Sequence, residues 1–130
     1  MGGANAFEVL SPGIMSMVQD LGRFGYARYG VAASGVLDGF ATRVGNLLVG
    51  NDENAAVVET TLMGLRMKAV RDAVVAVTGG DLQARKGNEP LAVWRSHLVR
   101  EGETISFTGP VNGLRSYLAV AGGIHAATVM

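Results

Sequence analysis

Glycine is the feature that most restricts the fold of this chain, because 19 glycines separate short apolar segments along its 130 residues. Short apolar runs between tight turns are typical of strands, whereas helices need longer uninterrupted patterns. The most apolar runs, 73–77 and 117–121, are far shorter than the roughly 20 residues that cross a bilayer. The sequence therefore predicts a mainly β domain with buried strands and no membrane-spanning segment.

Strands are expected, in order, at 7–10, 14–18, 57–62, 65–69, 73–77 and 117–121. The first closes at the turn Ser11-Pro12-Gly13. Two hairpins are predicted further on. One pairs 82–85 with 89–93, and the other pairs 97–100 with 104–107.

One helix is predicted, and its apolar positions recur at the spacing of a single face: Phe40, Val44, Leu47 and Leu48. We expect that face to pack against a sheet. Asp38 is placed as the N-cap and Gly50 as the C-terminal stop. Gly45 inside the helix costs about 1 kcal/mol relative to Ala, which predicts close packing at that position.

Composition and charge exclude several classes of function. Eleven basic residues balance eleven acidic ones, so no net field attracts nucleic acid or an anionic membrane surface. The absence of cysteine excludes disulfides, thiolate metal sites and a cysteine nucleophile. The two histidines, His97 and His125, have no diagnostic ligand spacing, so no metal is expected. The start lacks a signal-peptide pattern, which favours the cytoplasm.

Two segments of the chain stand apart from this strand pattern. Residues 22–39 are rich in glycine with little periodicity, which predicts a long ordered loop, and loops of that kind are commonly functional. Residues 124–130 follow the last predicted strand and stop without terminating residues. Unpaired strand edges would then remain exposed, so we expect the chain to be the front portion of a larger domain.

Six motifs, in this order and spacing, resemble the carboxyltransferase-domain family formerly called allophanate hydrolase subunit 2: Val18–Tyr26, Gly30–Asp38, Ala41–Asn51, Glu59–Gly64, Val77–Asp81 and Tyr117–Ile124. The family occurs in urea amidolyase and as the third subunit of bacterial 5-oxoprolinase. The resemblance implies a cyclophilin-like β-barrel, here partial, with residues 1–130 as its N-terminal portion. The chain departs from the family's pattern at Ala32-Ala33, Leu37 and near His125, and the family's later Ser/Arg-rich motif falls beyond Met130.

The resemblance also implies a function. It predicts a subunit of an ATP-dependent 5-oxoprolinase complex, inactive alone, that acts with a companion subunit on a small amide substrate. Two alternatives stay open: biotin-dependent carboxyl transfer to urea, and a regulatory binding protein that antagonises a sporulation-kinase inhibitor. No cofactor is expected on this chain alone, and ATP or carboxybiotin is implied for the complex. The start at Met1, close to the first strand, favours the 5-oxoprolinase interpretation.

Three candidate residues lie at the start of the glycine-rich segment. Arg23 and the backbone amides that begin at Gly22 are suitable donors for the oxygen of an amide carbonyl, where negative charge develops in the transition state. Arg23 is also suited to hold a carboxylate through two parallel bonds. The structural alternative is that Arg23 anchors the loop through Asp20. We predict Asp20 and Arg23 as catalytic and Gly22 as substrate-binding.

Four further candidates carry polar side chains. The amide of Gln19 matches urea or a lactam edge to edge, or caps a strand end. Ser34 lacks a neighbouring histidine, which favours a hydrogen-bonding loop residue over a nucleophile. Asp38 is a predicted substrate contact, although the N-cap role is the stronger interpretation. Glu59 is predicted to be catalytic, a partly buried acid with a raised pKa, and a satisfied buried carboxylate is the alternative.

Overall fold

The computed structural model describes residues 6–13, 15–19 and 38–123. These residues form α3 Gly39–Leu48 and the strands β1 Phe7–Pro12, β2 Met15–Gln19, β3 Val57–Thr61, β4 Leu65–Ala69, β5 Ala73–Asp81, β6 Ala84–Lys86, β7 Glu89–Pro90, β8 Arg95–Val99, β9 Thr104–Phe107 and β10 Asn112–Val120. The predicted mainly β fold with one helix is confirmed. The loop predicted for 22–39 lies almost wholly outside the described residues.

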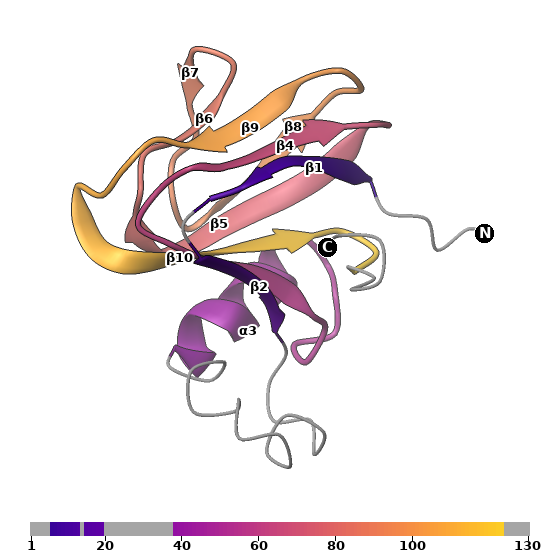
Figure 1. Ribbon diagram of the computed structural model, residues 1–130. Coiled ribbons are helices and arrows are strands. Elements are labelled where there is room, and N and C mark those ends of the chain that lie inside the picture. Colours follow the sequence, from indigo (N-terminus) through magenta and orange to yellow (C-terminus); the bar gives the residue numbers. More distant parts are fainter. Residues whose placement is uncertain (1–5, 14, 20–37, 124–130) are drawn as a thin grey trace.

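The strands form two open antiparallel sheets, in the orders β1-β4-β9-β6-β7 and β2-β3-β10-β5-β8 (Figure 1). The main core lies between them, because alternate residues of both sheets point inward. From the second sheet it takes Val58, Val75 and Leu118. The predicted alternation in 65–69 is confirmed, since Leu65, Met67 and Ala69 are buried while the residues between them are exposed. Helix α3 lies on the other face of the second sheet.

One predicted hairpin is confirmed and the other is wrong. β6 pairs with β7, with Lys86 opposite Glu89. β8 does not pair with β9, because β8 lies beside β5 in the second sheet and β9 lies between β4 and β6 in the first. Val99 of β8 and Ile105 of β9 both belong to the core between the sheets. The connection therefore crosses from one sheet to the other.

Both predicted ends of α3 are confirmed. Asp38 is the N-cap, and its carboxylate accepts a hydrogen bond from the backbone N–H of Ala41 at 2.9 Å. At the other end Gly50 adopts a left-handed conformation, with φ of 80°. The N–H of Gly50 donates to Leu47 at 3.1 Å, and that of Asn51 donates to Asn46 at 2.8 Å. This pair of bonds is the Schellman arrangement that ends many helices.

The face that α3 presents to the sheet differs from the prediction. Phe40 and Leu47 are 67% and 63% exposed. The buried residues are small or polar: Ala41, Thr42, Gly45 and Asn46. A Cβ atom at Gly45 would lie 3.3 Å from Oγ1 of Thr78, so the close packing predicted at this glycine is confirmed. Small side chains let the helix approach the sheet closely, and that approach leaves the apolar face outward.

The outward face of α3 is partly covered by an aromatic residue that precedes β8. The rings of Phe40 and Trp94 lie with their centroids 5.9 Å apart.

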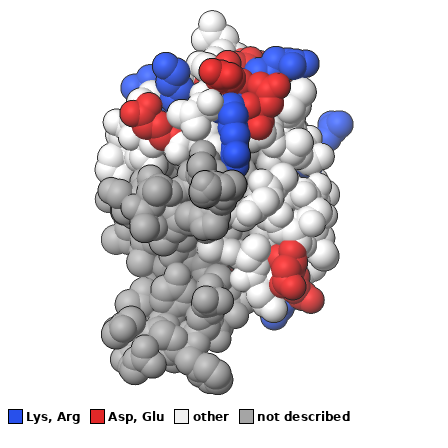
Figure 2. Space-filling model, turned by 90° about the vertical axis from the view of Figure 1, so that its right-hand side faces the viewer, with Lys and Arg blue, Asp and Glu red and all other residues white. Residues whose placement is uncertain are grey.

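On the face of the molecule seen in Figure 2, basic and acidic side chains lie close together near the top of the view. No helix in the described part of the chain is long and apolar enough to cross a membrane.

Candidate functional site

A polar cluster lies on the face of the second sheet that carries α3. Val58 and Leu118 point into the core between the sheets, so their neighbours along β3 and β10 point to the opposite face. Glu59 is paired with Tyr117 in the β3–β10 ladder. The next pair on the same face is Thr61 with Arg115. Two adjacent cross-strand pairs thus bring four polar side chains together.

Glu59 and Tyr117 form the buried part of this cluster. Each is only 2% exposed, and the Tyr117 hydroxyl donates a hydrogen bond to Oε2 of Glu59 at 3.0 Å. Burial raises the pKa of Glu59, while the hydrogen bond from Tyr117 and the positive charge of Arg115 act in the opposite direction. Burial, followed by the charge of Glu59, raises the pKa of Tyr117. Glu59 is therefore a carboxyl whose protonated form is favoured by its surroundings.

Thr61 and Arg115 carry buried atoms that lack partners. Oγ1 of Thr61 and Nε of Arg115 are both enclosed without a hydrogen bond to any described residue. A buried polar atom without a partner costs about 1–3 kcal/mol, so native proteins keep few of them. Both groups can donate a hydrogen bond. Their position beside the Glu59–Tyr117 pair is suited to an acceptor oxygen of a bound molecule.

The start of α3 lies against the same cluster. The negative charge of Asp38 contributes to the raised pKa of Tyr117, although less than burial and Glu59 do. The hydroxyl of Thr78 in β5 donates to the carbonyl oxygen of Ala41 at 2.7 Å and fixes the first turn to the sheet. The Asp38 carboxylate is engaged as the helix cap, which is the structural role that the sequence favoured.

Of the remaining predicted site residues, one lies at the end of a described strand and the others lie outside the described residues. Gln19 ends β2, where its backbone is paired with Val57 of β3, and Met17 of the same strand is paired with Glu59. β2 therefore borders the cluster. The other predicted site residues, Asp20, Gly22, Arg23 and Ser34, lie outside the described residues.

Sequence reasoning found Glu59 but missed Tyr117 and Arg115. A signal was present, because Arg115 and Tyr117 occupy alternate positions of a strand, and their polar groups therefore lie on one face of it. The pairing of β10 with β3 is not a local property, since the two strands are far apart in sequence. Only the register shows that Tyr117 meets Glu59.

The described residues do not supply a phosphate-binding loop at the Gly79-Gly80-Asp81 motif. These residues belong to β5, and Gly79 is paired with Ser116 of β10. A phosphate loop needs backbone amides free to point at the ligand. In the described part of the chain, no group of three or more His, Asp or Glu side chains is arranged to hold a metal ion.

Comparisons with known proteins agree with one another. The family model for the carboxyltransferase domain, subdomain A and B, matches residues 29–130. The C subunit of 5-oxoprolinase from Escherichia coli (strain K12) is 40% identical over 125 residues, which are 95% of this chain and 40% of that protein. Urea amidolyase of Lachancea kluyveri is 37% identical over 120 residues, which are 92% of this chain and 7% of that protein.

A solved structure shows the same fold. The crystal structure of the K. lactis urea amidolyase superposes with a TM-score of 0.82 at 38% sequence identity, covering 92% of this chain and 7% of that one. The chain therefore spans less than half the length of the E. coli relative and a small part of the urea amidolyases.

Proposed function

The chain belongs to the carboxyltransferase domain family, and on that basis we propose that it is part of a 5-oxoprolinase-type subunit that cleaves 5-oxoproline to glutamate in an ATP-dependent complex. The observation that carries the proposal is the 40% identity to the C subunit of E. coli 5-oxoprolinase along 95% of this chain. Because the chain spans 40% of that protein, the activity is proposed for the complex with a companion subunit. The cytoplasmic location expected from the sequence is part of the same proposal.

In the proposed reaction, the buried cluster binds and protonates the lactam. The carbonyl oxygen of the substrate accepts hydrogen bonds from Nε of Arg115 and Oγ1 of Thr61, the two buried groups without partners among the described residues. Water attacks the carbonyl carbon and releases a proton to solvent, negative charge grows on the carbonyl oxygen, and fixed donors stabilise that charge until the bond from the carbon to the ring nitrogen breaks. Glu59, whose pKa is raised by burial, is protonated more readily than an ordinary carboxyl and gives its proton to the departing ring nitrogen.

Tyr117 acts in this scheme as a positioning residue. Its hydroxyl holds one carboxyl oxygen of Glu59 at 3.0 Å and leaves the other oxygen available for proton transfer. Asp38 caps α3 and fixes the helix start beside Tyr117. In the proposal, Asp20 and Arg23 complete the catalytic group, and Gln19, Gly22 and Ser34 contact the substrate.

The proposed complex requires ATP, but no ATP-binding role is assigned to the described residues of this chain. Gly79 and Gly80 belong to β5 of the second sheet, so the Gly79-Gly80-Asp81 motif does not fit a phosphate-binding role. We assign binding of the nucleotide to the companion subunits. Carboxybiotin, in the alternative function, is likewise assigned to another chain.

The test is reconstitution of the complex with its companion subunits, followed by measurement of ATP-dependent glutamate release from 5-oxoproline. Glu59→Gln is expected to lower kcat by about 100-fold or more, as loss of a general acid does. Glu53→Gln is the matched control, because Glu53 is exposed and its ion pair with Arg43 lies on the surface. Equal activity of the complex with and without this chain would contradict the proposal.

Urea carboxylation is the second candidate, and the 37% identity to the L. kluyveri urea amidolyase favours it. Urea presents the same kind of carbonyl oxygen to Arg115 and Thr61. The two functions separate in one assay, in which the complex is given either 5-oxoproline or urea with a biotinylated carrier protein. Turnover of urea alone would replace the first proposal by the second.

A further inference from the structure

A hollow of about 580 Å³ lies where β1 and β9 end and β4 begins in the first sheet. Among the described residues, its lining includes one charged side chain, Arg66, and no acidic one. Three hydroxyl side chains, Ser11, Ser106 and Thr108, line it as well. Apolar surface comes from Met63, which is 46% exposed. The hollow thus combines one positive charge, several hydroxyls and an apolar wall.

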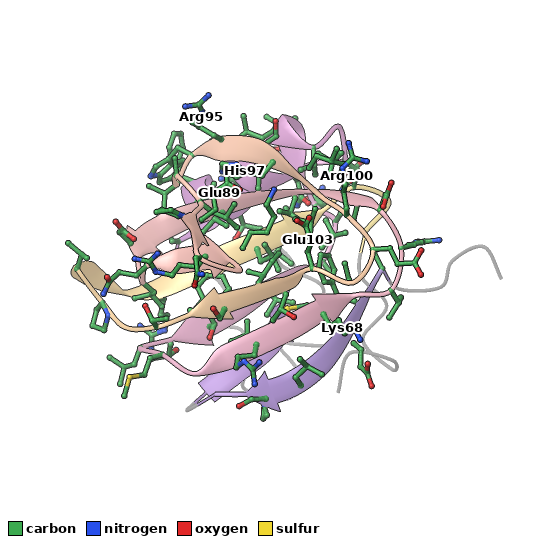
Figure 3. All side chains as sticks on the ribbon, turned by 90° about the horizontal axis from the view of Figure 1, so that it is seen from above. Lys68, Glu89, Arg95, His97, Arg100 and Glu103 are labelled. Atoms are coloured by element: carbon green, nitrogen blue, oxygen red, sulfur yellow. The ribbon has the colours of Figure 1, made fainter. Side chains whose placement is uncertain are left out.

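The register of the first sheet explains why the charge of Arg66 is uncompensated. Arg66 of β4 is paired with Ser11 of β1 and with Ser106 of β9. Lys68, two residues further along β4 and labelled in Figure 3, is instead paired with the acidic Glu8. Arg66 forms no ion pair with any described residue. The two basic residues share a face, but only one has an acid opposite it.

The hydroxyls beside Arg66 are also available. Among the described residues, the side chains of Ser11 and Ser106 form no hydrogen bond. Thr108 makes one long contact, from its hydroxyl to the carbonyl oxygen of Gln83 at 3.4 Å. A guanidinium matches a carboxylate through two parallel hydrogen bonds, and hydroxyls can complete the remaining acceptor positions of the anion.

From these observations we propose that the hollow binds a small organic acid, with its carboxylate on Arg66 between Ser11 and Ser106 and its apolar body against Met63. The thioether of Met63 is suited to contact an aromatic or aliphatic group. This site is separate from the Glu59 cluster, because Arg66 and Glu59 lie on different sheets. The inference is therefore independent of the function proposed above.

Binding of benzoate to the full chain, measured by calorimetry and by amide NMR shifts, tests the proposal. Benzamide is the neutral probe of the same shape. We expect saturable benzoate binding with shifts at Ser106 and Thr108, and at least about tenfold weaker binding of benzamide, because the charge-assisted bonds are lost. Arg66→Gln should weaken benzoate by at least about tenfold for the same reason.

Lys68→Gln is the matched control, because it removes the same charge from the same face and strand. It should change benzoate affinity by less than about twofold, since a surface charge outside the site is screened by salt. Met63→Ala should weaken benzoate severalfold while the preference over benzamide remains. Unchanged benzoate binding in Arg66→Gln, an equal loss in Lys68→Gln, or tighter binding of inorganic phosphate at the same amides would each overturn the proposal.

Discussion

The two faces of the second sheet are built from the same strands and differ sharply in chemistry. The face toward the first sheet carries Val58, Val75 and Leu118, all in the main core. The face under α3 carries two polar pairs whose burial is unfavourable, Glu59 with Tyr117 and Thr61 with Arg115. A polar group kept at a buried position without full compensation points to function more than to stability. One face therefore holds the fold together, and the other carries the candidate chemistry.

The largest effect is expected on the apolar face. Leu118 is 0% exposed in the main core. Leu118→Ala should lower the free energy of unfolding by about 2–5 kcal/mol, through lost burial and the cavity left behind. Urea denaturation measures the change. Leu98→Ala is the control with the same truncation at a residue that is 44% exposed, and an equal loss there would contradict the assignment of the core.

Next in size is a substitution that presses directly on the polar face. Gly79 has φ of 87°, and a Cβ there would lie 2.9 Å from Cδ2 of Tyr117. Gly79→Ala should cost about 1–2 kcal/mol for the backbone alone, and more because Tyr117 must move. Gly87→Ala is the control, since Gly87 also has positive φ but a Cβ there meets nothing within 4 Å. Thermal denaturation should show the larger loss for Gly79→Ala, and equal losses would contradict the packing on Tyr117.

A third prediction concerns the pH dependence of stability at Glu59. Because its pKa is raised in the folded state above the ordinary 4.5, protonation stabilises the fold at low pH. That contribution is lost as the pH rises through the folded-state pKa. Glu59→Gln removes this titration. The free energy of unfolding of the variant, relative to that of the parent protein, should therefore increase as the pH rises from 4.5 through the folded-state pKa of Glu59.

The size of this change in the free energy of unfolding follows from the difference between the folded-state and unfolded-state ionisation constants of Glu59. Each tenfold difference corresponds to about 1.4 kcal/mol. Urea denaturation at a series of pH values measures it. A stability difference that does not change between acid and neutral pH would be inconsistent with a raised pKa at Glu59.

The smallest effect is expected on the outward face of α3. Leu47 is 63% exposed, so Leu47→Ser should change the free energy of unfolding by less than about 0.5 kcal/mol. Ala41→Leu is the contrasting variant, because Ala41 is 0% exposed against the sheet and overpacking there costs about 1–3 kcal/mol. If Leu47→Ser proved the more harmful change in chemical denaturation, the helix would instead pack through its apolar side.

Local signals in the sequence predicted the local structure well. The caps of α3 at Asp38 and Gly50 and the alternation in β4 all depend on neighbouring residues. The failures depend on distant ones. β8 and β9 are separated by a short turn, yet they belong to different sheets. The close packing at Gly45 was predicted, but the outward position of Phe40 and Leu47 was not, because it depends on how the helix meets the distant strand β5.

The residues of the candidate site also differ in whether neighbouring residues alone could predict them. Glu59 was predicted because a carboxylate in an apolar strand is visible in the sequence itself. Tyr117 and Arg115 were not predicted, because only the pairing of β3 with β10 brings them to Glu59. The catalytic role of Glu59 stays a prediction. So do the roles of Asp20 and Arg23.

The most direct test of the central claim is a carbon-13 NMR titration of the Glu59 carboxyl. A buried acid on the polar face should titrate above its ordinary pKa of 4.5. Tyr117→Phe should move that pKa higher still, because the hydrogen bond from Tyr117 lowers it. A Glu59 carboxyl that titrates at or below 4.5, and does not respond to Tyr117→Phe, would contradict the account.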